Sequence, residues 1–410
     1  MRHADFLRLW AAQTVSDFGA RITREGLPMM AVMTLQAAPS QLGVLAALTH
    51  GPSILVGLAS GDFVDHTARR PILIAADLAR AAILVTLPLA AWLHMLSMLQ
   101  VYAAAALVGA ASVLFDIADH AYLPGLVGRA LVTDANAKLA VTESVAEMGG
   151  PALAGILFQW LTAPFAVAVN AATYVASALF LARIQSPEPP RDPSQKRRGW
   201  VDGVVTGWRS ARGEPRVRPM LFMTATGGLF GGFFSALYIA YVLRGLGLNP
   251  FLLGVGVAAG GVGALVGSLV TQPLARRIGV GPGICVMGVL SSLATMIVLL
   301  APKDTLGATA ALVVSQFFGD LFGVIPLILA SSLRQVILPQ SLLGRVGATF
   351  RAISGGAIVI GALAGGVLGQ VFGLRQALLW AIAGLMIGPV YGLFSPLGRV
   401  REMPVDAPAG

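Results

Sequence analysis

The chain has 410 residues, of which 56% are hydrophobic and 11% are charged, and its formal net charge is +9. A soluble domain carries about 25% charged residues, so this composition excludes a set of soluble domains and predicts an all-α polytopic membrane protein. Because one helix needs about 20 apolar residues to cross a bilayer, the length allows about twelve membrane helices. The basic excess is typical of membrane proteins, which collect Lys and Arg in cytoplasmic loops, and it does not indicate a nucleic-acid partner.

Several functional classes find no support in the sequence. The only cysteine, Cys285, excludes an internal disulfide and a cysteine-based metal site. Gly260-Gly261-Val262-Gly263 lies inside an apolar segment rather than after a strand, so it does not predict a nucleotide loop. There is no Walker sequence, metal-ligand cluster or Ser/His nucleophile pair, and the N-terminus lacks a cleavable signal pattern. We therefore expect no enzyme activity, no cofactor and no metal.

The chain divides into two apolar halves around one long polar stretch. We expect residues 1–183 to form an N-terminal six-helix bundle, 184–218 a cytoplasmic linker, 219–396 a C-terminal six-helix bundle and 397–410 a cytoplasmic tail. The twelve expected helices run over about 6–35, 41–64, 71–93, 100–120, 135–160, 164–183, 219–243, 250–276, 281–300, 306–333, 343–370 and 374–395. Pro124 and Gly125 are expected to break the chain after the fourth helix.

Basic residues fall mainly on one side of this arrangement. If both termini are cytoplasmic, the outer loops hold only Arg244, Lys303 and Arg375 among the Lys and Arg residues assigned to loops. This asymmetry predicts an inner-membrane protein with both ends inside and an even number of helices.

The second part of the linker has helical periodicity. Trp200, Val201, Val204, Val205 and Trp208 fall on one face of a helix, which predicts an amphipathic helix in the inner membrane interface. A plain connector with incidental tryptophans is the alternative.

The two halves also share a weak repeat. Ala-Leu-Ala-Gly occurs at 152–155 and again at 362–365, each time at a similar distance after a Leu-Pro pair. Similarity between two six-helix halves is typical of duplicated transporter folds.

A short charged turn separates the second and third expected helices. It reads Gly61-Asp62-Phe63-Val64-Asp65-His66-Thr67-Ala68-Arg69-Arg70-Pro71, with the pattern Gly-x-x-x-Asp-x-x-x-Arg-Arg. Its charges cannot lie in hydrocarbon, so the turn marks a membrane surface.

The first helix carries a stripe of polar side chains. Gln13, Asp17, Arg21, Arg24 and Glu25 share one helical face. A charge within a membrane segment costs at least about 2.5–3.5 kcal/mol and faces the bundle interior or a wet cavity. The stripe therefore predicts a polar interior that binds substrate or protons. The alternative is a self-neutralising ladder of Asp17, Arg21 and Glu25 that locks the helix.

Further acids lie deep in other helices. Asp116, Glu147 and Asp320, the last with Gln316 four residues before it, are candidates for substrate or proton binding, whereas Asp119 and Glu143 are expected near the cytoplasmic end. A buried carboxyl without a cation takes up a proton more readily than one in water, so these acids could couple transport to a proton gradient. Alternatively, they reach Arg21 or Arg24 and stay ionised.

The fifth helix contains small residues around a proline. Gly149-Gly150-Pro151-Ala152-Leu153-Ala154-Gly155 permits close helix packing and a kink at Pro151. Gly150, Pro151 and Gly155 resemble the core of an antiporter motif, Gly-Pro-x-x-Gly-Gly, with Ala154 in place of one Gly. Simple glycine-rich packing is the alternative.

Taken together, these patterns resemble the major facilitator superfamily (MFS), and within it the branch of macrolide efflux pumps and the enterobactin exporter. The charged turn resembles the family's signature between helices 2 and 3, although His66 and Ala68 depart from it. The other residues that carry the resemblance are Phe6–Trp10, Val15–Gly19, Leu27-Pro28, Asp77, Arg80, Phe115-Asp116, Leu123-Pro124, Ala135-Asn136, Gly150–Gly155, Arg334-Gln335, Leu338-Pro339 and Gly344–Val346.

The resemblance implies an MFS fold of two six-helix bundles around a central cavity, lined by helices 1, 4, 7 and 10. It also implies a gating role for Gly61, Asp65, Arg69 and Arg70 at the cytoplasmic side. We expect a monomeric secondary exporter of a small amphipathic molecule such as a drug, macrolide or siderophore, driven by proton antiport. The alternatives are a transport-inactive scaffold or sensor, and uptake or lipid transport on the same fold.

Overall fold

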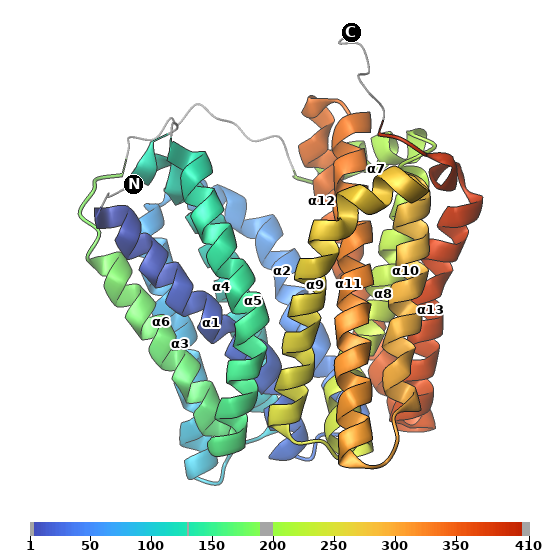
Figure 1. Cartoon of the computed structure of the whole chain (residues 1–410). Helices are drawn as coiled ribbons and strands as arrows, with labels where there is room; N and C mark the ends of the chain where they lie inside the picture. The colour runs from blue at the N-terminus through green and yellow to red at the C-terminus, as the bar shows by residue number, and fades with distance from the viewer. Residues whose placement is uncertain (1–3, 129–130, 189–199, 404–410) are drawn as a thin grey trace. The chain divides into compact units, whose positions relative to one another are not determined.

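The computed structural model describes residues 4–128, 131–188 and 200–403, without side chains for part of α2 and the start of α7. This part of the chain is built from helices and contains no strand. Contacts divide it into two compact units, Met1–Lys196 with Asn249–Ala258 and Arg197–Leu248 with Ala259–Gly410. We refer to them as unit 1 and unit 2, and Figure 1 shows a helical bundle in each.

Unit 1 holds six long helices. They are α1 (Ala4–Met33), α2 (Pro39–His66), α3 (Arg69–Trp92), α4 (Met98–Val127), α5 (Val132–Trp160) and α6 (Ala163–Ala182). Its core lies between α1, α3, α4 and α6, where Phe6, Leu73, Tyr122 and Leu181 are buried together. These residues come from the buried stripes of otherwise apolar helices, as expected for helices that pack against one another inside a bilayer.

Unit 2 holds one short helix and six long ones. They are α7 (Trp200–Gly213), α8 (Arg218–Ala240), α9 (Pro250–Ile278), α10 (Val280–Met296), α11 (Thr305–Ile337), α12 (Gln340–Phe372) and α13 (Leu374–Phe394), with short segments η2 (Tyr241–Gly245), η3 (Ile297–Leu300) and η4 (Pro396–Arg399). The first turns of α9 count with unit 1. The core of unit 2 lies between α8, α10, α11 and α12, around Cys285, Ile325 and Leu333.

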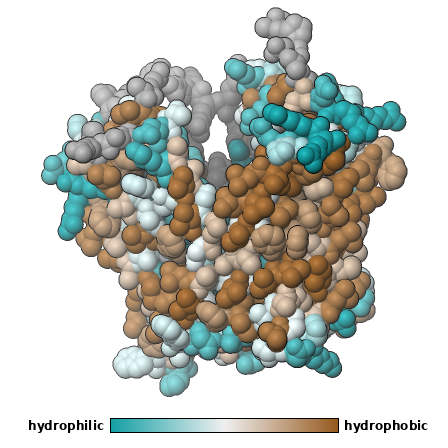
Figure 2. Space-filling model, in the orientation of Figure 1, coloured by the Kyte–Doolittle hydropathy of each residue, from teal (hydrophilic) through white to brown (hydrophobic). Residues whose placement is uncertain are grey.

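The helices are suited to a membrane. Nine of those in the described residues are long and apolar enough to cross a bilayer, including α3, α4, α6 and α8 to α13. Hydrophobic residues cover much of the visible surface of each unit, and hydrophilic residues gather towards its ends (Figure 2). The expected all-α membrane fold is confirmed, and each of the twelve expected long helices has a counterpart.

One predicted break is wrong. Helix α4 does not end near residue 120 but continues through Pro124 and Gly125 to Val127. A proline removes a single helix hydrogen bond, and membrane helices tolerate this where neighbouring groups pack around the site. The helix ends instead at Gly128, whose φ of 76° places it in the left-handed region that favours glycine.

The second part of the linker forms the expected helix, α7, which packs against α12. Gly207 lies directly against the backbone of Arg345, and the Thr349 hydroxyl donates a hydrogen bond to the Val204 carbonyl at 2.9 Å. Val205 and Trp208 remain 42% exposed each. The side chains of Trp200 and Val201 lie outside the described residues, so the membrane-facing role of this helix stays a prediction.

Gly207→Ala should undock α7 from α12, whereas Gly203→Ala should not. A Cβ at Gly207 would collide with the Arg345 carbonyl oxygen, but one at Gly203 meets open space. Both substitutions raise helix propensity by about 1 kcal/mol, so the difference between them isolates docking. Limited trypsin digestion should cleave after Arg209 faster in Gly207→Ala only; equal cleavage rates in the two variants would contradict this packing.

Candidate functional site

The polar stripe of α1 points towards α4 and α5 inside unit 1. Arg21 forms an ion pair with Glu147 and approaches Glu143 at 4.0 Å. Arg24 pairs with Glu147 at 2.8 Å and with Glu25 at 3.4 Å. The predicted i, i+4 ladder of α1 therefore does not account for Arg21, whose ion pairs in the described residues run to α5.

Glu147 does not fit the expectation of a carboxyl without a cation. It contacts both arginines of α1, which is the alternative that the sequence left open. Glu147 therefore bridges Arg21 and Arg24 and holds the two side chains in place.

Gly150 explains how Arg21 reaches α5. The Cβ and Cγ atoms of Arg21 lie so close to Gly150 that a side chain there would overlap them. Pro151 and Gly155 follow within α5 and are buried. The absence of a side chain at position 150 therefore allows Arg21 to lie between α1 and α5. The antiporter role of this motif stays a prediction.

Asp17 lies half-buried in α1, within a group of other acids. No hydrogen bond or ion pair to Asp17 occurs among the described residues, and the charges that act on it are those of Glu143, Arg21, Asp119 and Asp116. A carboxyl surrounded mainly by like charges is a better proton carrier than one held by arginine.

Asp119 belongs to the same group. Its Oδ1 accepts a hydrogen bond from the Nε2 atom of Gln13 on α1. The sequence predicts that Asp119 and Glu143 lie towards the cytoplasmic end of their helices, and this stays a prediction; α4 extends to Val127, about two turns beyond Asp119.

Asp116 is exposed on α4, and no ion pair to it occurs in the described residues. The next turn places His120 with its Nδ1 atom 2.7 Å from the Asp116 backbone carbonyl oxygen. We define the charged cluster of unit 1 by its members: Asp17, Arg21, Arg24, Glu25, Asp116, Asp119, Glu143 and Glu147.

Gln316 and Asp320 belong to unit 2 and are described separately. Both lie on α11, with Gln316 half-buried and Asp320 exposed. The Asp320 carboxylate lies against Gly260 of α9, at a distance that leaves no room for a Cβ. Glycine at this point of α9 therefore makes the space that Asp320 occupies.

The polar turn between α2 and α3 is shorter than expected. Only Thr67 and Ala68 separate the helices, and Arg69 and Arg70 form the first turn of α3. The Nη1 atom of Arg69 donates to the Ala121 carbonyl of α4 at 2.8 Å. Gly61 and Asp65 fall in α2, in a stretch whose surroundings lie outside the described part of the chain. Their gating role therefore stays a prediction.

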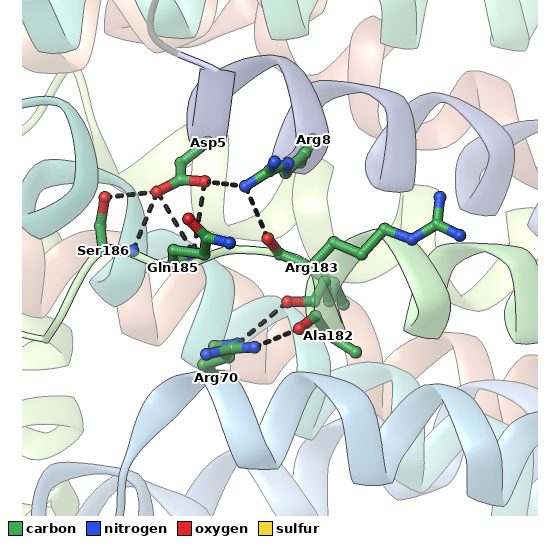
Figure 3. Close-up of polar contacts among 8 residues, drawn as sticks. Asp5, Arg8, Arg70, Ala182, Arg183, Gln185 and Ser186 are labelled. Carbon is green, nitrogen blue, oxygen red and sulfur yellow. Dashed lines mark hydrogen bonds and ion pairs between the residues drawn. The ribbon is translucent and has the colours of Figure 1, made fainter.

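Arg70 belongs to a set of polar contacts that holds the start of the linker to α1, α3 and α6 (Figure 3). Its Nε atom donates to the Leu181 carbonyl at 3.0 Å, and its Nη2 atom donates to the Ala182 carbonyl. Arg8 of α1 donates to the Arg183 carbonyl at 2.6 Å. These donors bind carbonyls at and just after the C-terminal end of α6, where the regular i to i+4 helix hydrogen bonds stop.

Two carboxylates complete this set, which we call the linker clamp. Asp5 accepts hydrogen bonds from the Ser186 backbone at 2.9 Å and from its hydroxyl at 2.5 Å. Glu188 accepts from the backbone amides of Arg69 and Arg70 at 3.0 and 2.8 Å, which caps α3. The first residues of the linker are therefore fixed to unit 1.

Asp5 stands in the first turn of α1, beside the polar linker. Burial alone would raise its pKa, but hydrogen bonds from the Ser186 side chain, the backbone of Gln185 and Ser186, and Arg8 outweigh burial and lower the pKa from 3.8 to about 2. Because the folded pKa is depressed, this contact stabilises unit 1 above the ordinary pKa and is lost as pH falls through about 2.

A buried ion pair on α3 was not predicted from the sequence. Asp77 and Arg80 on α3 are almost completely buried, with Arg80 Nη2 2.5 Å from Asp77 Oδ1. The Arg80 guanidinium lies between the rings of Phe115 and Tyr174, 4.4 and 4.2 Å from their centroids. Two charges three residues apart in an apolar segment were the available signal. Within the described residues, no group of His, Cys, Asp and Glu could hold a metal ion.

Comparisons with known proteins identify the family. The family described as transmembrane secretion effector, MFS_3, matches residues 1–408. This chain belongs to that family. The match confirms the resemblance to MFS exporters, and it makes the chain a multi-pass membrane transporter.

Relatives carry efflux and transporter names. The chain is 26% identical over 412 residues to the multidrug efflux pump Tap of Mycolicibacterium fortuitum, covering 97% of this chain and 96% of the relative. It is 24% identical to the MFS-type transporter YfiS of Bacillus subtilis (strain 168), covering 96% and 93%.

Solved structures share the fold. The nucleoside transporter NupG matches with a TM-score of 0.78 at 11% identity, covering 97% of this chain and 100% of NupG. A bacterial homologue of the lysosomal transporter Spinster, in an inward-facing state, matches with a TM-score of 0.73 at 13% identity, covering 96% and 97%. At these identities the likeness concerns the fold, which is that of MFS transporters.

Proposed function

We propose that this protein is a secondary exporter that moves a small amphipathic molecule out of the cell by alternating access, in exchange for protons. The observation that carries the proposal is the charged cluster, in which six carboxyl groups accompany two arginines within unit 1. Such groups are costly in a membrane and mark substrate or ion pathways. The efflux-pump name of the relative Tap supports the outward direction.

The members of the cluster suit different roles. Arg21 and Arg24 are held by Glu147, Glu143 and Glu25, so these five residues form a paired network that sets the shape of the site. Asp17 and Asp119 form no ion pair with an arginine among the described residues, although the charge of Arg21 acts on Asp17, and they are the best candidates to carry a proton. Gln13 orients Asp119, because its amide donates to that carboxyl group.

Asp116 and Asp320 have different surroundings. Asp116 is exposed on α4, where it could meet the substrate, and Gln316 with Asp320 would form a second polar position on α11. The proposal places the protein in the bacterial inner membrane as a monomer, with both termini and the linker clamp in the cytoplasm. The distribution of basic residues supports this orientation.

Transport assays test the proposal directly. Cells that express the chain should expel members of a panel of dyes and antibiotics faster than cells with an empty vector, and a protonophore should stop this efflux. Purified protein in liposomes should move the same compound when a pH gradient is imposed. Efflux that continues after the gradient collapses would refute proton coupling, and transport of none of the compounds despite normal insertion would favour a scaffold role.

A further inference from the structure

The last third of unit 2 carries arginines without acids of its own. From residue 321 to residue 401 the sequence contains no Asp, Glu or Lys, and its arginines are Arg334, Arg345, Arg351, Arg375, Arg399 and Arg401. Arg334 stands in the last turn of α11, and Arg345 and Arg351 follow in the first half of α12. Asp320, the preceding acid on α11, lies about 21 Å from Arg334 along the helix axis. This end of the two helices therefore has an excess of positive charge.

Arg334 is half-buried and stacks on an aromatic ring. Its guanidinium carbon lies 4.2 Å from the centroid of the Phe350 ring on α12. Phe350 belongs to the buried core of unit 2 together with Leu338 and Val346, so the cation borders apolar surface. Among the described residues, no ion pair and no side-chain hydrogen bond to Arg334 occurs. A guanidinium that lies flat on a ring keeps the donors of its edge available, and these match a carboxylate bidentately.

Arg351 lies at the same level of α12, because it follows Phe350 directly and is turned from it by about 100° around the helix. Its side chain is exposed, and its Nη1 atom lies 3.6 Å from where a Cβ of Gly347 would stand. Gly344 shares this helical face, and a Cβ there would meet open space. The face therefore offers a cation and room for a ligand beside it.

Neighbouring groups in the described part of the chain do not neutralise these arginines. Arg345 and Arg351 lie in the N-terminal half of α12, towards the end at which a helix carries a positive partial charge. Glu214 of α7, the helix that packs on α12, already pairs with Arg216 at 2.9 Å. Ionisable side chains within membrane helices are costly and mark the paths of substrates and ions. The arrangement therefore favours a negatively charged group from outside the chain.

We propose that Arg334 and Arg351 bind the carboxylate of an amphipathic organic anion, and that such anions are among the molecules that the protein exports. The inference rests on the proposed export function and names a substrate class for it. The stacked guanidinium of Arg334 holds the carboxylate, and the charge of Arg351 attracts it. Because apolar core residues border the cation, a ligand with an apolar body binds better than a bare ion.

Equilibrium dialysis tests the binding without any transport. The full-length chain, in nanodiscs of phosphatidylcholine alone, should bind 2-naphthoate about tenfold more tightly than 2-naphthamide, which has the same rings and no charge, as expected for hydrogen bonds to a charged group. Arg334→Gln and Arg351→Gln should each remove this preference and leave the affinity for 2-naphthamide unchanged. Arg276→Gln, which changes an exposed arginine in the last turn of α9, should keep the preference.

Two other anions identify the source of the negative group. Inorganic phosphate, and phosphatidylglycerol built into the nanodisc, should leave 2-naphthoate binding unchanged at high salt, which screens the charge of the bilayer surface. If phosphatidylglycerol displaces 2-naphthoate, the arginines hold a lipid head group and the proposal is overturned. If phosphate displaces it at an equal concentration, the site recognises charge alone, which also overturns the proposal.

Efflux assays distinguish this inference from the proposed function. Cells that express the chain should expel 2-naphthoate, and Arg351→Gln should lose this efflux while neutral compounds still leave the cell. Efflux of dyes or antibiotics by a protein that binds 2-naphthoate and 2-naphthamide equally overturns the inference and leaves the exporter function standing. Preferential binding of 2-naphthoate without efflux of any compound supports the anion site and overturns the exporter function, and with it the assignment of the anion as substrate.

Discussion

Asp17→Asn should abolish protonophore-sensitive efflux while leaving the protein folded and inserted. Asparagine has nearly the same shape as aspartate but cannot exchange a proton. Since no ion pair to Asp17 occurs among the described residues, its loss breaks no salt bridge seen there. The expected result is efflux at the level of cells without the protein, together with normal amounts of protein in the membrane.

Asp134→Asn is the matched control for this experiment. Asp134 is an exposed carboxyl in the first turn of α5, where it pairs with Lys138 at 3.3 Å. The substitution is the same, but the residue lies outside the charged cluster, so efflux should persist. Efflux should be measured at several external pH values in both variants and in the unchanged protein.

Asp119→Asn tests whether the loss of proton coupling is specific to Asp17 or follows from removing any carboxyl group of the charged cluster. The amide of Gln13 already donates to Asp119, so an asparagine there can keep that hydrogen bond through its carbonyl oxygen. If efflux in Asp17→Asn retains its normal pH dependence, Asp17 is not the proton carrier. Loss of coupling in Asp119→Asn alone would then assign that role to Asp119.

The sequence predicted which face of α1 turns towards neighbouring helices, because a polar stripe at helical spacing in an apolar segment has one favourable orientation. It did not predict which partners the stripe meets. Arg21 has acidic residues on its own helix and on α5. Which of them forms the ion pair depends on how closely α1 and α5 approach each other. That approach is set by Gly150, whose missing side chain makes room for the arginine.

One helix boundary differs from its prediction. Pro124 predicts a break after the fourth helix, whereas α4 continues through Pro124 to Val127, because a membrane helix tolerates the single hydrogen bond that proline removes. The linker clamp could not be predicted at all, because most of its bonds involve backbone groups that any sequence supplies.

Arg80→Met should destabilise the protein more than the loss of any exposed ion pair. Arg80 and Asp77 are 3% and 0% exposed, so removing the arginine leaves a buried carboxylate without its cation. Breaking a buried pair in this way costs about 3–5 kcal/mol. The substitution also removes the guanidinium from between Phe115 and Tyr174, which adds the loss of two cation–π contacts.

The measurement is the free energy of unfolding in detergent or bicelles, obtained by steric trapping or by titration with sodium dodecyl sulfate. Lys138→Met, which breaks the exposed pair with Asp134, should cost only about 0–1 kcal/mol. The double variant Asp77→Asn with Arg80→Met should recover part of the loss, because it no longer buries a charge. If Arg80→Met and Lys138→Met cost the same, or if the double variant is as unstable as the sum of its parts, charge pairing between Asp77 and Arg80 does not stabilise unit 1.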